Sequence, residues 1–278
     1  MSISKRIAVV TGGNKGIGYS IVKELCSKFD GIVYLTARNV KLGEEAVNNL
    51  KKEGYDPQFH QLDIEDEKSI NTFAEYVKKK YSGLDVLVNN AAIAYKHDST
   101  APFGEQAENT VKINFFGLFN VCQSLFPLLR PHARVVNISS SAGMLSKIPD
   151  AELKKRLASE DLSEKELCQL MEDFVNAAKA GEHVQKGWGS SAYSVSKVGV
   201  TALTIIQQRQ FNKDPREDII VNAVHPGYVD TDMTSHKGPL TPEQGAAAPS
   251  YAALLPPSVQ EPKGQMIWQD KSVVQWAS

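Results

Sequence analysis

Seven short apolar runs, rich in β-branched residues, recur along this chain, and a segment of helical length separates each from the next. The runs are RIAVVT, GIVYLTA, PQFHQLD, LDVLVNNA, ARVVNISS, DIIVNAVHP and GQMIW. They are apolar almost throughout, whereas strands with one wet face would alternate between apolar and polar residues. Parallel strands covered by helices on both faces have this pattern, so we expect an α/β fold built on a doubly wound parallel sheet.

The intervening segments predict six sheet-associated helices, at 16–29, 40–53, 66–81, 104–130, 192–213 and 241–255. In TPEQ, Thr241 is the expected N-cap, Pro242 the first helical residue and Gln244 the residue that closes a capping box. Single α/β domains reach this size, and no internal repeat appears. The whole chain, 1–278, is therefore expected to form one domain.

Residues 144–188 interrupt the alternation of strands and helices, and their pattern predicts a helical insertion. Ser163 and Glu166 form a capping box, after which apolar residues share one helical face. These residues are Leu167, Leu170, Met171, Phe174, Val175 and Ala178. The face either packs onto the domain or binds a partner helix, and we prefer the packing interpretation.

The content of charged residues, cysteine and histidine excludes several classes of function. Charged residues make up 23% of the chain, the net charge is -1 and the two signs are interspersed, so no surface for nucleic acid or membrane is expected. The N-terminal apolar run is too short for a secretory signal. Cys26, Cys122 and Cys168 lie far apart, and the histidines never pair at ligand spacing, so neither disulfides nor a metal site is predicted. We expect a cytosolic protein.

The first run leads into TGGNKGIG, from Thr11 to Gly18. At such a strand-to-helix turn, backbone N–H groups and the helix dipole hold a phosphate. A P-loop needs a lysine after the last glycine, but Tyr19 stands there, which argues against a nucleoside triphosphate. A plain turn and a dinucleotide site remain. The position of Gly12, Gly16 and Gly18 between strand and helix favours a dinucleotide site, as in a Rossmann-type fold.

The residue at the end of the second strand indicates which dinucleotide, NAD(H) or NADP(H), the site would bind. An acidic residue there accepts from a free adenosine ribose, whereas a 2′-phosphate needs a cation. The strand ends in LTARN, which places Arg38 at this position, and Lys15 in the glycine turn is a second cation. NADP(H) is therefore predicted, although both residues could also be ordinary solvated surface cations.

The spacing G-x-x-x-G-x-G and the sequence NNAA resemble those of the short-chain dehydrogenase/reductase family, and the resemblance covers nearly the whole chain. Within that family, VTGGNKGIG, FHQLD, LDVLVNNA, NFFG, SSAY and PGYVDTDM fit the animal-type cytosolic carbonyl reductases. The resemblance implies an NADPH-dependent reductase of ketones, aldehydes and quinones. It further implies a monomer, because the inserted helices in that group cover a surface that relatives use for association.

The resemblance also assigns cofactor contacts residue by residue. Asp63 would meet the adenine ring and Asn90 the adenosine, while Val229 and Thr231 would contact the nicotinamide. Ala92 replaces the glycine that is usual at its position. The full set implied is Gly12, Asn14, Lys15, Gly16, Ile17, Gly18, Arg38, Asp63, Ile64, Asn90, Tyr193, Lys197, Val229 and Thr231.

AYSVSKVG places Tyr193 and Lys197 four apart on one helix face. The pair alone is a weak signal, since ordinary helices contain it too. Ser140 strengthens it, because it ends the strand VVNISS at the same sheet edge. Its neighbour Ser139 is the alternative, which strand alternation sends to the opposite side. A free tyrosine has a pKa of about 10, so a nearby cation must stabilise its conjugate base.

By resemblance, Tyr193 is the general acid, Lys197 lowers its pKa and holds the nicotinamide ribose, and Ser140 orients the substrate oxygen. Asn114, in VKINFFG, matches an asparagine that links the lysine through water to solvent; its alternative role is to satisfy local backbone.

The expected substrate contacts are Ser140, Tyr193, Trp188, Tyr228 and Met233. Tyr228 would form an aromatic wall of the pocket and Met233 an adaptable, polarizable one, and such walls suit flat or varied apolar carbonyl compounds. Small residues at Ser141 and Ala142 would widen the pocket.

Val224 and His225 stand where mammalian-like relatives carry cysteines, so glutathione-linked activity is not predicted. Two alternatives remain open. One is a reductase of narrow specificity for a steroid or another metabolite ketone, and the other is a non-catalytic NADP(H)-sensing protein. Retention of Ser140, Tyr193 and Lys197 favours an enzyme.

Overall fold

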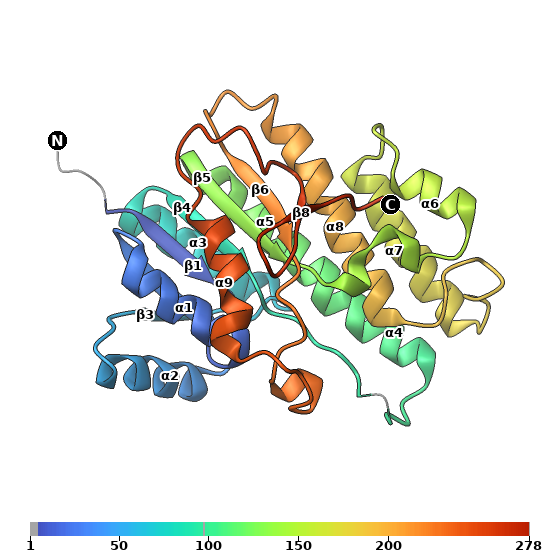
Figure 1. Cartoon of the computed structure of the whole chain (residues 1–278), viewed down its shortest axis with the longest axis horizontal. Coiled ribbons are helices and arrows are strands. Elements are labelled where there is room, and N and C mark those ends of the chain that lie inside the picture. The colour runs from blue at the N-terminus through green and yellow to red at the C-terminus, as the bar shows by residue number, and fades with distance from the viewer. Residues whose placement is uncertain (1–4, 97, 278) are drawn as a thin grey trace.

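The computed structural model describes residues 5–96 and 98–277. Within them, one sheet has the strand order β3-β2-β1-β4-β5-β6-β7-β8 (Figure 1). All neighbouring strands pair in parallel except β7 and β8. The predicted α/β, Rossmann-type doubly wound sheet is confirmed. The strands are β1 (Ile7–Val10), β2 (Ile32–Ala37), β3 (Gln58–Gln61), β4 (Leu84–Asn89), β5 (Leu129–Ile138), β6 (Ile220–Val224), β7 (Met266–Ile267) and β8 (Val273–Val274).

Helices cover both faces of the sheet. One face packs against α1 (Gly16–Lys28), α2 (Val40–Lys52) and α9 (Pro242–Ala253). The other packs against α3 (Glu67–Tyr81), α4 (Phe103–Val111), α5 (Leu118–Leu125) and α8 (Ala192–Phe211). Successive residues of β1 serve opposite faces: Ala8 and Val10 pack on the first layer, and Ile7 and Val9 on the second. This double burial explains the continuous apolar runs. The capping box of Thr241 and Gln244 begins α9 as predicted.

The helix expected at 104–130 is interrupted. A π-helix, Lys112–Gly117, separates α4 from α5, and a 3₁₀ turn, Phe126–Leu128, leads into β5 at Leu129. The prediction therefore placed the end of the helix too late and the start of this strand four residues too late. Pro127 and Pro131 lack the N–H that a continuing helix requires. The short strand β8 was not predicted, because two residues carry no periodicity.

The inserted segment forms α6 (Ala151–Leu157) and α7 (Glu164–Lys179). Helix α7 lies beside α4 and α8, and both inserted helices are at the side of the molecule away from α2 (Figure 1). The capping box of Ser163 and Glu166 is present. Of the predicted apolar face, Val175 is half-buried and the other five residues are buried in one cluster with α4 and α8. The packing interpretation is confirmed for α7.

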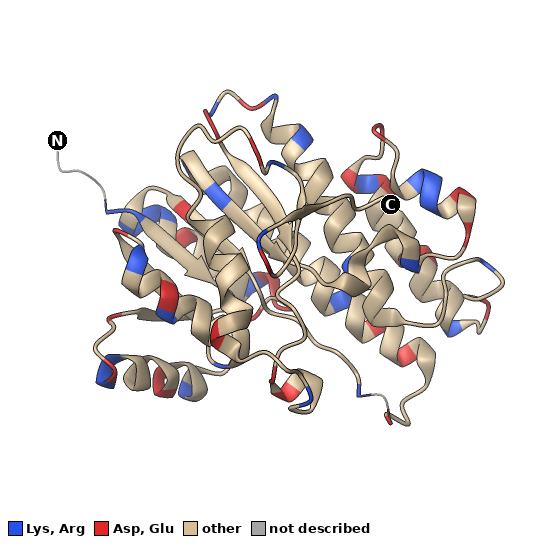
Figure 2. Ribbon diagram, viewed as in Figure 1, with Lys and Arg blue, Asp and Glu red and all other residues tan. Residues whose placement is uncertain are grey.

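Lys and Arg residues are interspersed with Asp and Glu residues along the ribbon (Figure 2). Within the described residues, no helix combines the length and apolar composition needed to cross a bilayer. In the same part of the chain, no three His, Cys, Asp or Glu side chains lie close enough to hold a metal ion. Cys26, Cys122 and Cys168 are free thiols.

Candidate active site

The carboxyl ends of β1, β4, β5 and β6 lie along one edge of the sheet, and the turns that follow them build the site. These turns are the glycine turn (11–18), the segment 90–100, the serine turn (140–145) and the loop 225–237. Ligands of open α/β sheets bind at such an edge, where neighbouring crossovers leave in opposite directions. All four turns contain residues that the sequence analysis singled out for catalysis, for substrate contact or for the cofactor.

The glycine turn is shaped for close approach. Gly12 and Gly16 have φ values of 62° and 55°, in the left-handed region that glycine adopts without strain. A Cβ on Gly18 would lie 2.4 Å from Asn90 Nδ2. That amide donates to the carbonyl oxygens of Thr11 (3.0 Å) and Gly12 (3.1 Å). Asn90, predicted as a cofactor residue, therefore holds the turn in place.

The first turn of α1 suits an anion. Its N-cap, Lys15, makes no side-chain capping hydrogen bond, and no acidic residue lies in the first turn. The backbone N–H groups at this end therefore face outward without a side-chain acceptor from the cap. Thr231 lies against this turn, since its Cγ2 would be 3.3 Å from a Cβ on Gly16.

Both predicted phosphate-binding cations are exposed and paired with carboxylates. Lys15 Nζ lies 2.6 Å from Asp232 Oδ2, and Arg38 Nη1 lies 3.7 Å from Glu65 Oε2. The Lys15 ammonium lowers the pKa of Asp232. Exposed ion pairs contribute little to stability, so a phosphate dianion competes for these cations at small cost.

On the adenine side, local turn bonds fix the predicted residues. The Asp63 carboxylate accepts from the Glu65 N–H at 3.0 Å, and the Asp63 N–H donates to Ser69 Oγ at 2.9 Å. Ile64 is buried and packs where Gly117 leaves space.

Tyr193 and Lys197 lie close together in the first two turns of α8. Lys197 Nζ is 5.8 Å from the Tyr193 ring centroid and donates to the Ile138 carbonyl at 2.6 Å. Burial lowers the pKa of Lys197 to about 8. Burial raises the pKa of Tyr193, and a hydrogen bond with the Ser140 side chain partly offsets that rise. The three predicted catalytic side chains are therefore brought together.

The two candidate serines have separate surroundings. Ser140 is half-buried, bonds to Tyr193 and accepts from the Ala142 N–H at 3.1 Å. Ser139 is buried and bonds to Thr201 Oγ1 (2.7 Å) and the Lys197 carbonyl (3.3 Å). Strand alternation thus directs Ser139 toward the body of α8 and Ser140 toward Tyr193.

Asn114 lies in the π-helix and is 1% exposed. Its Oδ1 accepts from the Ile93 N–H at 2.8 Å, and its Nδ2 donates to the Ile93 carbonyl at 2.9 Å and to Ser196 Oγ at 3.1 Å. These partners lie on the segment after β4 and on α8, so the side chain does not serve its own helix backbone. Single π-turns in helices are common at functional sites.

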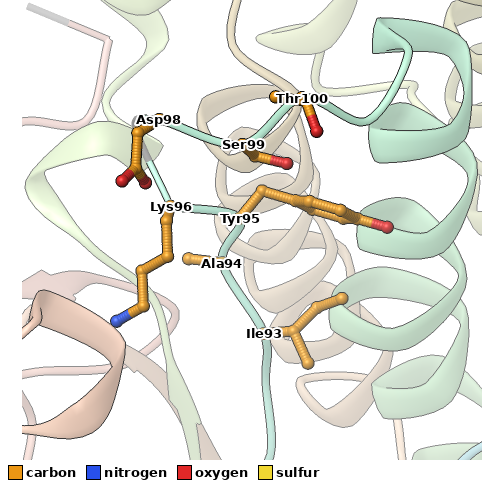
Figure 3. Close-up of a pocket in the computed structure, with 7 residues that line it drawn as sticks. All are labelled: Ile93, Ala94, Tyr95, Lys96, Asp98, Ser99 and Thr100. Atoms are coloured by element: carbon orange, nitrogen blue, oxygen red, sulfur yellow. The ribbon is translucent and has the colours of Figure 1, made fainter.

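In the segment after β4, the sequence analysis named Asn90 but missed the residues that follow Ala92. Residues 93–96 and 98–100 line an open cavity of about 510 Å³ (Figure 3). Lys96 and Tyr95 extend in opposite directions: the Tyr95 hydroxyl accepts from Asn109 Nδ2 at 2.8 Å, whereas Lys96 Nζ donates to the Asp232 carbonyl and to Ser235 Oγ (2.9 Å). Lys96 therefore connects two loops of the site. Its position just past the carboxyl end of a central strand was the available signal.

The predicted substrate residues lie in two different environments. Tyr228 (52% exposed) and Met233 (38% exposed) lie on the loop after β6 and face solvent. Trp188 is 3% exposed and packs on Phe174, with ring centroids 5.6 Å apart. Trp188, expected as a substrate contact, thus exposes little surface, because its indole packs in the core cluster with α7 and α8.

Two positions beside the loop are also buried. Val224 lies fully within β6, and His225 packs against Trp268 at a centroid distance of 4.4 Å. Burial lowers the pKa of His225 to about 4, so its ring is neutral at cellular pH.

Comparison with known proteins gives concordant results. A family model described as short chain dehydrogenase matches residues 6–150 and 177–240, leaving out α6 and most of α7. Carbonyl reductase [NADPH] 1 of Rattus norvegicus is 49% identical over 278 residues, covering 99% of this chain and 100% of that protein. The Homo sapiens protein of the same name gives the same identity and the same coverage. The solved structure of salutaridine reductase from Papaver somniferum is 33% identical, with a TM-score of 0.85 over 94% of this chain and 99% of that one.

Proposed function

Because the chain belongs to the short-chain dehydrogenase/reductase family, we propose that the site at the carboxyl edge of its sheet reduces ketones, aldehydes and quinones to alcohols or hydroquinones. The protein is an NADPH-dependent carbonyl reductase. The observation that carries the proposal is the arrangement of Tyr193, Ser140 and Lys197 in one site beside a glycine turn. This supplies a proton donor, an orienting hydroxyl and a cation at one place.

The residues present fit NADPH. The glycine turn leaves the space that a pyrophosphate needs, and the N–H groups that open α1 would bind it. Lys15 and Arg38 would hold the 2′-phosphate, and Asp63 and Asn90 the adenosine side. Val229 and Thr231 would line the nicotinamide, and Tyr193 and Lys197 the adjoining ribose. When bound, the cofactor supplies the hydride that reduces the carbonyl carbon.

Tyr193 is the proton donor in this mechanism. Its raised pKa keeps the phenol protonated at cellular pH, so it can give its proton to the substrate oxygen. Ser140 orients that oxygen by hydrogen bonding in the manner of an oxyanion hole. With a pKa of about 8, Lys197 is mostly protonated at pH 7, and its positive charge stabilises the phenolate left on Tyr193. We assign Asn114 the role of connecting Lys197 through water to solvent, on the Ile93 side.

Steady-state NADPH consumption tests the proposal, with quinones, dicarbonyls, aromatic aldehydes and steroid ketones as substrates. Turnover of several classes is the expected result. Turnover of one class alone would favour a reductase dedicated to one metabolite. Binding of NADPH without turnover of any substrate would contradict the enzyme proposal and favour a cofactor-sensing protein.

Charge reversal tests the assignment of the phosphate-binding cations. Arg38→Glu is expected to lower kcat/KM for NADPH by about 10- to 100-fold and to leave that for NADH nearly unchanged, because only the 2′-phosphate contact is lost. Lys112→Glu is the matched control, since Lys112 pairs with the same carboxylate, Glu65, at 3.2 Å. An equal loss with both cofactors in the Arg38 variant would contradict the assignment.

We also propose a monomer in the cytosol. The insertion helix α7 packs on α4 and α8 and buries its apolar face there, which leaves that face unavailable to a second subunit. Three free thiols are compatible with a reducing compartment. Sedimentation velocity is expected to give a single species of about 30.5 kDa, the mass of one chain. A dimer or tetramer would contradict the proposal.

A further inference from the structure

A tryptophan near the C-terminus, Trp276, is part of the packed body of the molecule. It follows β8 and is 7% exposed. Together with Leu157 of α6 and Ile205 of α8, it lines a cavity of about 220 Å³. In Figure 1 the chain accordingly ends beside these helices.

Trp276 holds the serine turn by two hydrogen bonds. Its indole Nε1 donates to the Gly143 carbonyl at 2.7 Å, and its own carbonyl accepts from the Leu145 N–H at 3.2 Å. The bonded residues lie on either side of Met144. The indole N–H is a donor only and needs an acceptor when buried, so this contact fixes both partners.

The serine turn also packs closely against α8. A Cβ on Gly143 would lie 2.5 Å from Ser139 Oγ and 2.8 Å from the Lys197 carbonyl. Gly143 also donates its N–H to the Ser140 carbonyl at 2.8 Å, and Ser140 Oγ accepts from the Ala142 N–H at 3.1 Å. The turn that sets the Ser140 side chain is thus in contact with both α8 and Trp276.

We propose that Trp276 is a positioning residue for carbonyl reduction, which acts by holding the serine turn so that Ser140 points at the substrate oxygen. The inference rests on the proposed function. A hydroxyl that orients an oxygen must be held within about 0.5 Å, and a bond of 2.7 Å to the neighbouring peptide supplies a restraint in addition to the packing on α8. The restraint comes from a residue 133 positions away in the chain.

Two substitutions of Trp276 test the role of its N–H donor separately from the role of its packed ring. Trp276→Phe keeps a buried ring and removes the N–H; we expect kcat to fall about tenfold, with little change in KM for NADPH. Trp276→His places Nε2–H where the indole N–H was and removes the six-membered ring. We expect it to keep kcat within about threefold of the wild type but to lower the melting temperature. Val273→Ala, an exposed change in β8 just before Trp276, is the control and should leave kcat unchanged.

A double-mutant cycle with Ser140→Ala provides the decisive readout. If Trp276 acts through Ser140, Trp276→Phe should lower kcat by less than about twofold in the Ser140→Ala background. An equal loss of kcat in both backgrounds would overturn the inference, because a structural defect does not depend on Ser140. So would full activity of Trp276→Phe, or a folded Trp276→His protein that has lost kcat. A wild-type protein that binds NADPH but reduces no carbonyl would refute the proposed function itself, and the inference with it.

Discussion

Lys197 carries a charge at a position where charge is costly. The side chain is 2% exposed, and Nζ donates to the Ile138 carbonyl at 2.6 Å. Burial lowers its pKa from 10.5 to about 8, which means that the folded protein disfavours the charged form. The catalytic requirement for a cation beside Tyr193 is therefore met at the expense of stability.

Lys197→Met is expected to abolish turnover and to raise the free energy of unfolding at pH 7 by on the order of 1 to 3 kcal/mol. Below pH 8 lysine is protonated in both the folded and the unfolded wild-type protein, so the cost of burial is fully present. Between pH 8 and 10.5 the folded protein releases the proton first. The wild type therefore gains stability as pH rises, and the difference from the variant shrinks.

Urea unfolding at pH 7 and pH 9.5 measures the effect of Lys197→Met. The exposed change Lys112→Met is the control and should show no such pH dependence. A Lys197→Met protein that is less stable than the wild type at pH 7 would show that the bond to Ile138 outweighs the cost of the buried charge.

Tyr193 is expected to carry the proton transfer. Tyr193→Phe removes the hydroxyl while keeping the ring, so kcat should fall by about 10²- to 10⁴-fold and the Kd for NADPH should stay within about threefold. Single-turnover kinetics and cofactor fluorescence measure the two quantities. Normal turnover in this variant would mean that another group donates the proton.

Sequence reasoning could place the catalytic side chains because their geometry follows from local rules. A spacing of four on a helix puts Tyr193 and Lys197 on one face, and strand alternation separates Ser139 from Ser140. The burial of Trp188, which was expected to contact substrate, shows the limit of such rules. Its burial depends on how the insertion folds back onto α8, which no local pattern encodes. Lys96 and Trp276 were missed for the same reason, since their partners lie more than a hundred residues away.

At the scale of elements, the serine turn follows β5 and packs against α8. Gly143→Ala would place a methyl group 2.5 Å from Ser139 Oγ and 2.8 Å from the Lys197 carbonyl, so α8 and the turn must separate. We expect a loss of about 1 to 3 kcal/mol in stability and a fall in kcat. The Kd for NADPH should change little, because the glycine turn is a separate element. Thermal unfolding and steady-state kinetics measure these effects. An unaltered kcat would show that the turn can accommodate the methyl group without displacing Ser140.

The strands and most helices followed from periodicity because each buries its side chains in a regular way. The exceptions have physical causes. The π-helix at Lys112–Gly117 retains helical composition, and what distinguishes it is Asn114, whose partners lie on Ile93 and α8. β8 pairs through only two residues, and its side chains are mostly outside the core. Tertiary contacts, rather than local sequence, define both elements.

At the scale of the whole molecule, the insertion begins and ends at neighbouring positions of the fold. The Asp150 N–H donates to the Gly187 carbonyl at 3.3 Å, so residues 151–186 form an excursion with adjacent ends. Along it, the apolar face of α7 packs on α4 and α8 in one buried cluster. The excursion therefore covers two sheet-associated helices that would otherwise expose apolar side chains to water.

Replacing residues 151–186 by two glycines is expected to keep the sheet and to turn the proposed monomer into a dimer or a larger species, because the uncovered faces of α4 and α8 need a new apolar partner. Sedimentation velocity measures the association, and retained NADPH binding shows that the glycine turn is intact. Glu172→Ala, on the exposed face of α7, is the control and should sediment as the wild type does. A deletion variant that binds NADPH and stays monomeric would show that α7 stabilises its own domain without blocking an interface.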